Sequence, residues 1–90
     1  MSLELEQQTI QELFEAVIKT EDKLQIRDFL DDQNISDVAG LVDEFPAYES
    51  QIIANMSVNR AASVFKILDL STQKTIIHEL PANTTASLLN

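Results

Sequence analysis

The feature that most restricts the fold of this chain is a short motif that recurs at a nearly constant interval. Segment 37–42 (DVAGLV) aligns with 60–65 (RAASVF) and then with 85–89 (TASLL), so that Ala39, Ala62 and Ala86 are 23 and 24 residues apart. Segment 51–57 (QIIANMS) aligns in the same way with 75–81 (TIIHELP). A period in the twenties, with two short helices in each unit, is typical of stacked helical hairpins.

Apolar residues follow a helical period through most of the chain, and no run alternates like a strand. The sequence has only one Gly and two Pro, too few for a set of tight hairpin turns. We therefore predict an all-α fold, a right-handed α–α superhelix of about six to seven short helices. The residues expected on the inward faces are Ile10, Leu13, Phe14, Val17, Ile18, Ile26, Phe29, Leu30, Val38, Leu41, Val42, Phe45, Tyr48, Ile52, Ile53, Met56, Ala61, Val64, Phe65, Leu68, Ile76, Ile77 and Leu80. Ala86, Leu88 and Leu89 are expected to begin a seventh helix.

The repeat also predicts how the single domain, residues 1–90, is organised. Residues 1–33 form two leading helices, 34–57 the first repeat, 58–81 the second, and 82–90 the start of a third. Because the third unit begins without a second helix to cover it, we expect the sequence to be a piece of a longer chain.

Small polar residues stand where each new helix is expected to begin. Thr20, Ser36 and Ser71 are the predicted N-caps of three helices, and Asn83 or Thr84 is the predicted N-cap of the last. Side-chain oxygens of such residues accept hydrogen bonds from the free amides of the first turn.

One equivalent position of the repeat carries a small residue in every unit, namely Gly40, Ser63 and Ser87. A glycine inside a helix costs about 1 kcal/mol relative to alanine, so its presence needs a reason. We expect these small residues to let successive helices approach closely.

The charge is strongly negative and unevenly distributed. The chain has 15 Asp and Glu against 6 Lys and Arg, a net charge of −9. Residues 1–49 hold 13 of the acids and 3 of the bases, whereas residues 50–90 hold 2 acids and 3 bases. Such a chain repels nucleic acids and anionic lipid surfaces, and its acidic half suits a cation or a basic partner. No apolar run reaches the roughly 20 residues of a membrane-spanning helix.

Carboxylates gather in the acidic half. Those of segment 28–32 lie near the end of one expected helix, and Asp37, Asp43 and Glu44 lie on the next. Mg²⁺ prefers oxygen ligands, keeps several of its waters and needs only one or two carboxylates. Asp37, Asp43 and Glu44 are therefore candidates for weak cation binding, the alternative being an acidic face that is merely solvated.

The sequence contains no combination of residues typical of a catalytic site. It has no Cys and a single His, which excludes thiol chemistry and metal sites built on paired histidines. One glycine cannot form a phosphate-binding loop. His78 is expected in the last turn of a helix, where a cationic side chain interacts favourably with the helix dipole. We predict that the chain is not an enzyme.

The segment 34–46 (NISDVAGLVDEFP) resembles the opening of the cytosolic N-terminal domain of MgtE-type magnesium transporters. That family reads roughly h-P-x-D-h-A-x-L-h-x-x-L-P, where h is apolar. Segments 60–69 and 70–81 resemble the Ala-rich helix and the hairpin that follow, and the resemblance covers about residues 10–90. Middle domains of flagellar motor switch proteins share this kind of repeat.

The resemblance implies a regulatory domain at the cytoplasmic face of the cell membrane. In that family the helical domain precedes a pair of CBS domains and a membrane pore domain of the same chain, which forms a homodimer. Mg²⁺ bound between acidic surfaces of the helical domain and the CBS pair closes the channel. The family can carry an acidic ligand at the position of Ser63, so no family ligand transfers to this chain. The alternative is a stand-alone helical-repeat adaptor that binds a protein partner.

Overall fold

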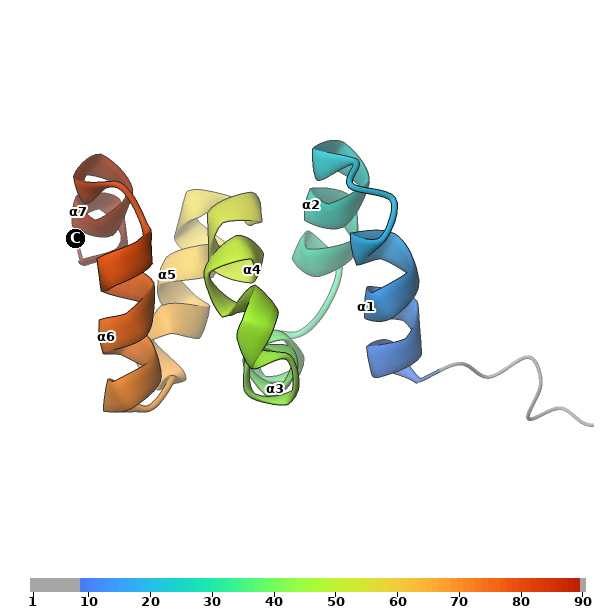
Figure 1. The fold of residues 1–90 in the computed structure, drawn as a ribbon, viewed down its shortest axis with the longest axis horizontal. Helices are drawn as coiled ribbons and strands as arrows, with labels where there is room; N and C mark the ends of the chain where they lie inside the picture. Colours follow the sequence, from blue (N-terminus) through green and yellow to red (C-terminus); the bar gives the residue numbers. More distant parts are fainter. Residues whose placement is uncertain (1–8, 90) are drawn as a thin grey trace, which may run out of the picture.

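The computed structural model describes residues 9–89, which form seven α-helices and one short 3₁₀ helix, with no strand among them (Figure 1). The predicted all-α class is therefore confirmed, while expectations for residues 1–8 and for residue 90 lie outside the described residues. The elements are α1 (Ile10–Ile18), α2 (Lys23–Asp31), α3 (Ile35–Glu44), η2 (Pro46–Tyr48), α4 (Glu49–Asn55), α5 (Val58–Ile67), α6 (Leu70–Glu79) and α7 (Ala82–Leu89).

The helices form two rows, in which each helix packs against the one two places along the chain. One row contains α1, α3, α5 and α7, and the other contains α2, α4 and α6. The molecule is elongated, 50 × 25 × 21 Å, with α1 and α2 at one end and α6 and α7 at the other (Figure 1). This arrangement is the stacked series of hairpins that the repeat predicts.

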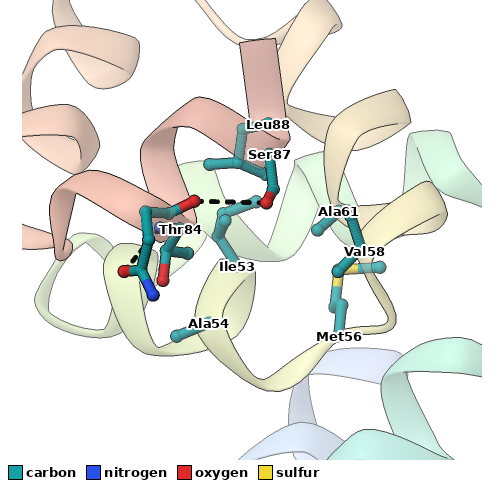
Figure 2. Close-up of a pocket in the computed structure, with 9 residues that line it drawn as sticks. Ile53, Ala54, Met56, Val58, Ala61, Thr84, Ser87 and Leu88 are labelled. Atoms are coloured by element: carbon teal, nitrogen blue, oxygen red, sulfur yellow. Dashed lines mark hydrogen bonds between the residues drawn. The ribbon is translucent and has the colours of Figure 1, made fainter. Parts of the chain in front are cut away.

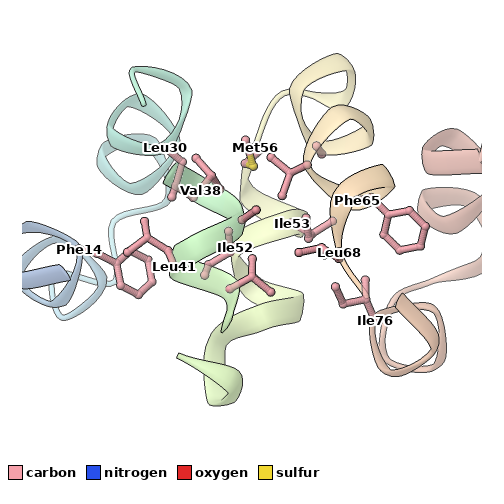
Figure 3. Close-up of a cluster of buried hydrophobic side chains, with 14 of the residues drawn as sticks. Phe14, Leu30, Val38, Leu41, Ile52, Ile53, Met56, Phe65, Leu68 and Ile76 are labelled. Atoms are coloured by element: carbon pink, nitrogen blue, oxygen red, sulfur yellow. The ribbon is translucent and has the colours of Figure 1, made fainter. Parts of the chain in front are cut away.

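A single continuous core runs between the two rows (Figure 3). It contains no buried charged or polar residue among those described. Most of the residues expected on inward faces are in it, because the helices follow the apolar period of the sequence. The buried residues are Phe14, Ile18, Ile26, Leu30, Val38, Ala39, Leu41, Val42, Ile52, Ile53, Met56, Ala61, Val64, Phe65, Leu68, Ile76 and Leu88.

Three expected core residues are exposed: Leu13, at 40%, and Tyr48 and Ile77, at 37% each. Tyr48 ends the 3₁₀ helix that Pro46 begins, and this tighter helix changes the angular position of Tyr48 relative to α4. Its ring still contacts the core edge-on, with its centroid 6.1 Å from that of Phe14. Ile77 is the repeat equivalent of the buried Ile53, but it lies on α6, the last helix of its row among those described.

Aspartates, rather than the expected hydroxyl residues, cap two of the helices. Asp22 accepts hydrogen bonds from Leu24 N and Gln25 N at the start of α2, and Asp69 accepts one from Thr72 N at the start of α6. The predictions that Thr20 and Ser71 are N-caps are therefore wrong. An aspartate adds a negative charge to the hydrogen bond, which suits the positive end of the helix dipole.

The other two predicted caps lie inside their helices. Ser36 is in the first turn of α3, whose N-cap position is held by Asn34, and α7 begins at Ala82, ahead of both Asn83 and Thr84. The capping box that opens α1 was not anticipated. In it Glu12 N donates to Thr9 Oγ1 at 3.1 Å and Thr9 N donates to Glu12 Oε1 at 2.9 Å.

Gly40 is not a close-packing residue. A methyl group added at its Cα would meet no atom within 4 Å. Its equivalents Ser63 and Ser87 are exposed, and their hydroxyls donate to carbonyl oxygens one turn back on their own helices. The expectation that this small residue allows helices to approach closely is therefore wrong, because its position faces away from the neighbouring helix.

The turn between α1 and α2 contains one residue in the left-handed region. Glu21 has φ of 57°, and its backbone N–H donates to the carbonyl of Ile18 at 3.2 Å. This conformation costs free energy for a residue with a Cβ, whereas glycine adopts it freely.

Candidate functional site

The three residues predicted to bind a cation lie at the two ends of α3. Asp37 is in the first turn, where Asn34 Nδ2 lies 3.5 Å from its Oδ2 atom. Asp43 and Glu44 are in the last turn, about 10 Å away along the helix axis. All three are exposed. The structure thus does not bring Asp37 together with the other two, and no group of three His, Asp or Glu placed to hold a metal ion occurs among residues 9–89.

A different set of carboxylates lies across α3, α4 and α6. Glu49, the first residue of α4, is half-buried and lies within electrostatic range of Glu79, Asp69 and Asp43. The hydroxyl of Ser50 donates to Glu79 Oε1, which links the start of α4 to the end of α6. We call Glu49 and the three carboxylates that act on it, Asp43, Asp69 and Glu79, the acidic cluster; Asp69 and Glu79 themselves stand about 15 Å apart, at opposite ends of α6. Sequence reasoning found only Asp43, because the other three are separated from it by up to 36 residues.

The environment of the acidic cluster changes two pKa values. Burial raises the pKa of Glu49 above its ordinary value of 4.5, and the negative charges of Glu79, Asp69 and Asp43 raise it further. The pKa of Asp69 is lowered, because its carboxylate accepts a hydrogen bond from the Thr72 backbone N–H at 2.8 Å, with a further contribution from the Thr72 side chain. A nearby cation would therefore relieve repulsion on ionised Glu49.

A second polar centre joins α2 to the start of α5. Arg60 Nη2 donates to the backbone carbonyl oxygens of Leu30, at 3.3 Å, and Gln33. Arg60 Nε lies 3.6 Å from Asp31 Oδ1, and the same carboxylate oxygen accepts hydrogen bonds from the backbone N–H and the hydroxyl of Ser57 at 3.3 and 3.4 Å. The guanidinium group therefore caps the C-terminal end of α2, where carbonyl groups have no donor within the helix.

This network removes Asp31 from the group of free carboxylates that the sequence suggests at the end of α2. A third contact, from Arg27 Nε to Asp31 Oδ2 at 3.8 Å, lies on the surface of α2 itself. The pairing with Arg60 was missed at the sequence level. One sequence feature could have indicated this pair, since Arg60 is the one basic residue in the three aligned copies of the motif.

The described part of the chain is hollowed in several places. A hollow of about 230 Å³ lies between α4, α5 and α7. A wider groove of about 560 Å³ follows α5 beside Ser87, and another of about 570 Å³ lies between α2 and α4. Ser63, Lys66 and Ser87 line the groove along α5, and Glu21 and Lys23 line the groove between α2 and α4.

His78 lies in the last turn of α6, as expected. In the part of the chain from residue 9 to residue 89, no helix has both the length and the apolar character needed to cross a membrane.

Comparison of the sequence with protein-family models, with characterised proteins and with solved structures found no match. The resemblance to MgtE-type transporters accordingly rests on the motif residues alone, and what it implies about function stays a prediction.

Proposed function

We propose that this chain is the regulatory helical domain of a magnesium transporter, which responds to Mg²⁺ by closing against a neighbouring CBS domain pair. Two kinds of evidence support the proposal. The motif at 34–46 resembles the start of such domains, and the stack of helical hairpins is the architecture which that resemblance implies.

The observation that carries the proposal is the environment of Glu49. Its ionised form is disfavoured by burial and by three neighbouring carboxylates, so a cation that approaches this surface relieves repulsion that already exists. Hydrated Mg²⁺ needs only one or two carboxylates and fills its other positions with water. A group of three ligands on this domain alone is therefore not required.

The mechanism that follows is a two-state equilibrium. Without Mg²⁺, two acidic surfaces repel each other and the assembly is open. With millimolar Mg²⁺, ions between the surfaces screen that repulsion and favour the closed form, because they bind the closed form more tightly than the open one.

The test is limited proteolysis of the intact gene product over a Mg²⁺ titration, at constant ionic strength. We expect Mg²⁺ to protect it, and the double variant Glu49→Gln with Glu79→Gln to need several-fold more Mg²⁺ for half-protection. The double variant Glu15→Gln with Asp28→Asn is the matched control, since it removes two exposed carboxylates outside the acidic cluster. Protection that is indifferent to Mg²⁺ would contradict the proposal.

A second candidate is a helical-repeat adaptor that binds a protein partner. It is favoured by large apolar side chains left in solvent, above all Leu24, which is 72% exposed, and Leu70, which is 64% exposed. An adaptor of this kind predicts a conformation that does not respond to Mg²⁺, so the same proteolysis experiment separates the two functions.

A further inference from the structure

The cavity of about 230 Å³ lies where the C-terminal end of α4 meets the first turns of α7 (Figure 2). Thr84, Ser87 and Leu88 of α7 face Ile53 and Ala54 of α4 across it, and residues of α5 close a third side. The full lining is Ile53, Ala54, Met56, Val58, Ala61, Asn83, Thr84, Ser87 and Leu88.

The equivalent position one repeat earlier is filled by a side chain. α5 begins at Val58 and α7 at Ala82, so Arg60 and Thr84 are each the third residue of equivalent helices. α2 ends at Asp31 and α4 at Asn55, which again are 24 residues apart. At the earlier position the guanidinium group of Arg60 reaches the end of α2 and donates to the carbonyl oxygen of Leu30.

At the later position the side chain is too short to do this. Thr84 replaces Arg60, and Ala54 is the equivalent of Leu30. In the last turn of α4, the carbonyl groups of Gln51 and Ile53 accept from Asn55 Nδ2 and Met56 N, whereas that of Ala54 has no donor within the helix. The volume that the arginine side chain occupies in one repeat is thus a cavity in the next.

The chemistry of the lining matches the missing side chain. Ile53 and Met56 offer apolar contacts for a methylene stem, and the end of the α4 dipole favours a positive charge. No Lys, Arg or His lines the cavity to repel a cation. A planar group with several N–H donors suits carbonyl oxygens at a helix end better than a compact ammonium does.

We propose that this cavity binds the guanidinium group of an arginine side chain that a partner protein supplies. The chain has two arginines, Arg27 and Arg60, and both of them contact Asp31, so neither is available. The choice of an arginine rests on the equivalence with Arg60, since the cavity lies in residues 50–90, which hold 2 acids and 3 bases, and has no acidic residue in its lining. This inference concerns a different surface from the acidic cluster and does not depend on any response to Mg²⁺.

The binding is weaker than the internal contact of Arg60. Asn55 stands where the earlier repeat has Asp31, and its amide donates to the carbonyl of Gln51 on its own helix at 2.8 Å. Pro81 stands where Ser57 provides two donors to Asp31. Without the carboxylate, we expect a single arginine to bind with a dissociation constant on the order of 1 mM.

The first test titrates the chain with N-acetyl-arginine methylamide and follows its backbone amide signals by NMR. We expect saturable shifts centred on Ala54 and Thr84, and at least several-fold weaker effects from the matched lysine and citrulline compounds. The absence of shifts would overturn the proposal. Equal shifts from citrulline would overturn it as well, because the charge would then contribute nothing.

The second test supplies the arginine within the chain. We expect Thr84→Arg to raise the melting temperature by about 4 °C, as one added hydrogen-bonded contact does in a domain of this size, and to abolish the shifts caused by the arginine compound. Thr75→Arg is the matched control, since it makes the same change at an exposed position of α6. If Thr84→Arg stabilises no more than Thr75→Arg while the wild-type chain shows no shifts, the proposal fails on both counts. If Thr84→Arg does not fold, the titration of the wild-type chain decides.

Discussion

Arg60 Nε lies 3.6 Å from Asp31 Oδ1, although the two residues are 29 positions apart and belong to helices in different rows. Together with the hydrogen bonds from Arg60 to the carbonyls of Leu30 and Gln33, this contact ties the leading helices to the second repeat. It is the one ionic link between distant helices among residues 9–89. Its loss should therefore loosen the junction between α2 and α5 specifically.

Replacing Arg60 by methionine tests this link. The methionine keeps an apolar stem but removes every donor, which leaves the end of α2 uncapped. We expect a loss of about 1–2 kcal/mol in the free energy of unfolding, measured by urea denaturation. The control is Arg27→Met, which removes a solvent-exposed pair within one helix and should cost less than about 0.5 kcal/mol. Equal losses in the two variants would show that Arg60 is only a surface charge.

Gly40→Ala should stabilise the protein. The added methyl group meets no atom within 4 Å, and alanine restricts the unfolded chain more than glycine does. We expect a gain of about 1 kcal/mol in the free energy of unfolding. Ser36→Ala, an exposed change in the first turn of the same helix, serves as the reference. A destabilised Gly40→Ala protein would mean that a neighbouring helix does occupy that space.

Glu21→Gly should also stabilise the protein, in spite of adding a glycine. Glu21 adopts φ of 57°, which costs about 1 kcal/mol for a residue with a Cβ and nothing for glycine. We expect a gain of up to about 1 kcal/mol, reduced by the greater freedom of glycine in the unfolded chain. Glu21→Ala separates the two effects, because it removes the carboxylate but keeps the Cβ. If the alanine variant gains as much as the glycine variant, charge rather than backbone conformation is the cause.

Glu49→Gln should change the dependence of stability on pH. The pKa of Glu49 is higher in the folded protein than its ordinary value of 4.5, so the folded state binds the proton more tightly. Ionised Glu49 therefore lowers stability at neutral pH, and this loss is relieved as the pH falls through the raised pKa. We expect Glu49→Gln to stabilise the protein at pH 7 by less than about 1 kcal/mol, since solvent screens most of the repulsion.

The gain from Glu49→Gln should shrink as the pH approaches the ordinary value of 4.5. Thermal unfolding at several pH values measures it, with Glu15→Gln, an exposed change on α1, as the control. A gain that is the same at neutral and acidic pH would contradict the assignment of repulsion to Glu49.

The sequence predicted the helices and their inward faces well, because a 3.6-residue apolar period is a local property that packing preserves. The sequence-based predictions were wrong where the environment of a residue depends on how helices are placed relative to one another. Small residues at the Gly40 position could mean close approach or an open surface, and only the orientation of α3 decides between them. Tyr48 was wrongly predicted to face inward, because the 3₁₀ helix after Phe45 shifts the helical period of the apolar residues.

The candidate site was predicted only in outline. An acidic surface was expected, but Asp37 lies away from it, and Glu49, Asp69 and Glu79 enter it from α4 and α6. These residues are distant in the sequence and meet only because alternate helices stack. In the same way, the pairing of Arg60 with Asp31 follows from the placement of α2 beside the start of α5.

The measurement that tests the central claim most directly is small-angle X-ray scattering of the intact gene product as Mg²⁺ is added. The reference is a titration with K⁺ at matched ionic strength. Screening between two acidic surfaces predicts that millimolar Mg²⁺ reduces the radius of gyration, and that Glu49→Gln with Glu79→Gln weakens this response. A radius of gyration that is unchanged by Mg²⁺, or reduced equally by K⁺, would contradict a role in sensing magnesium.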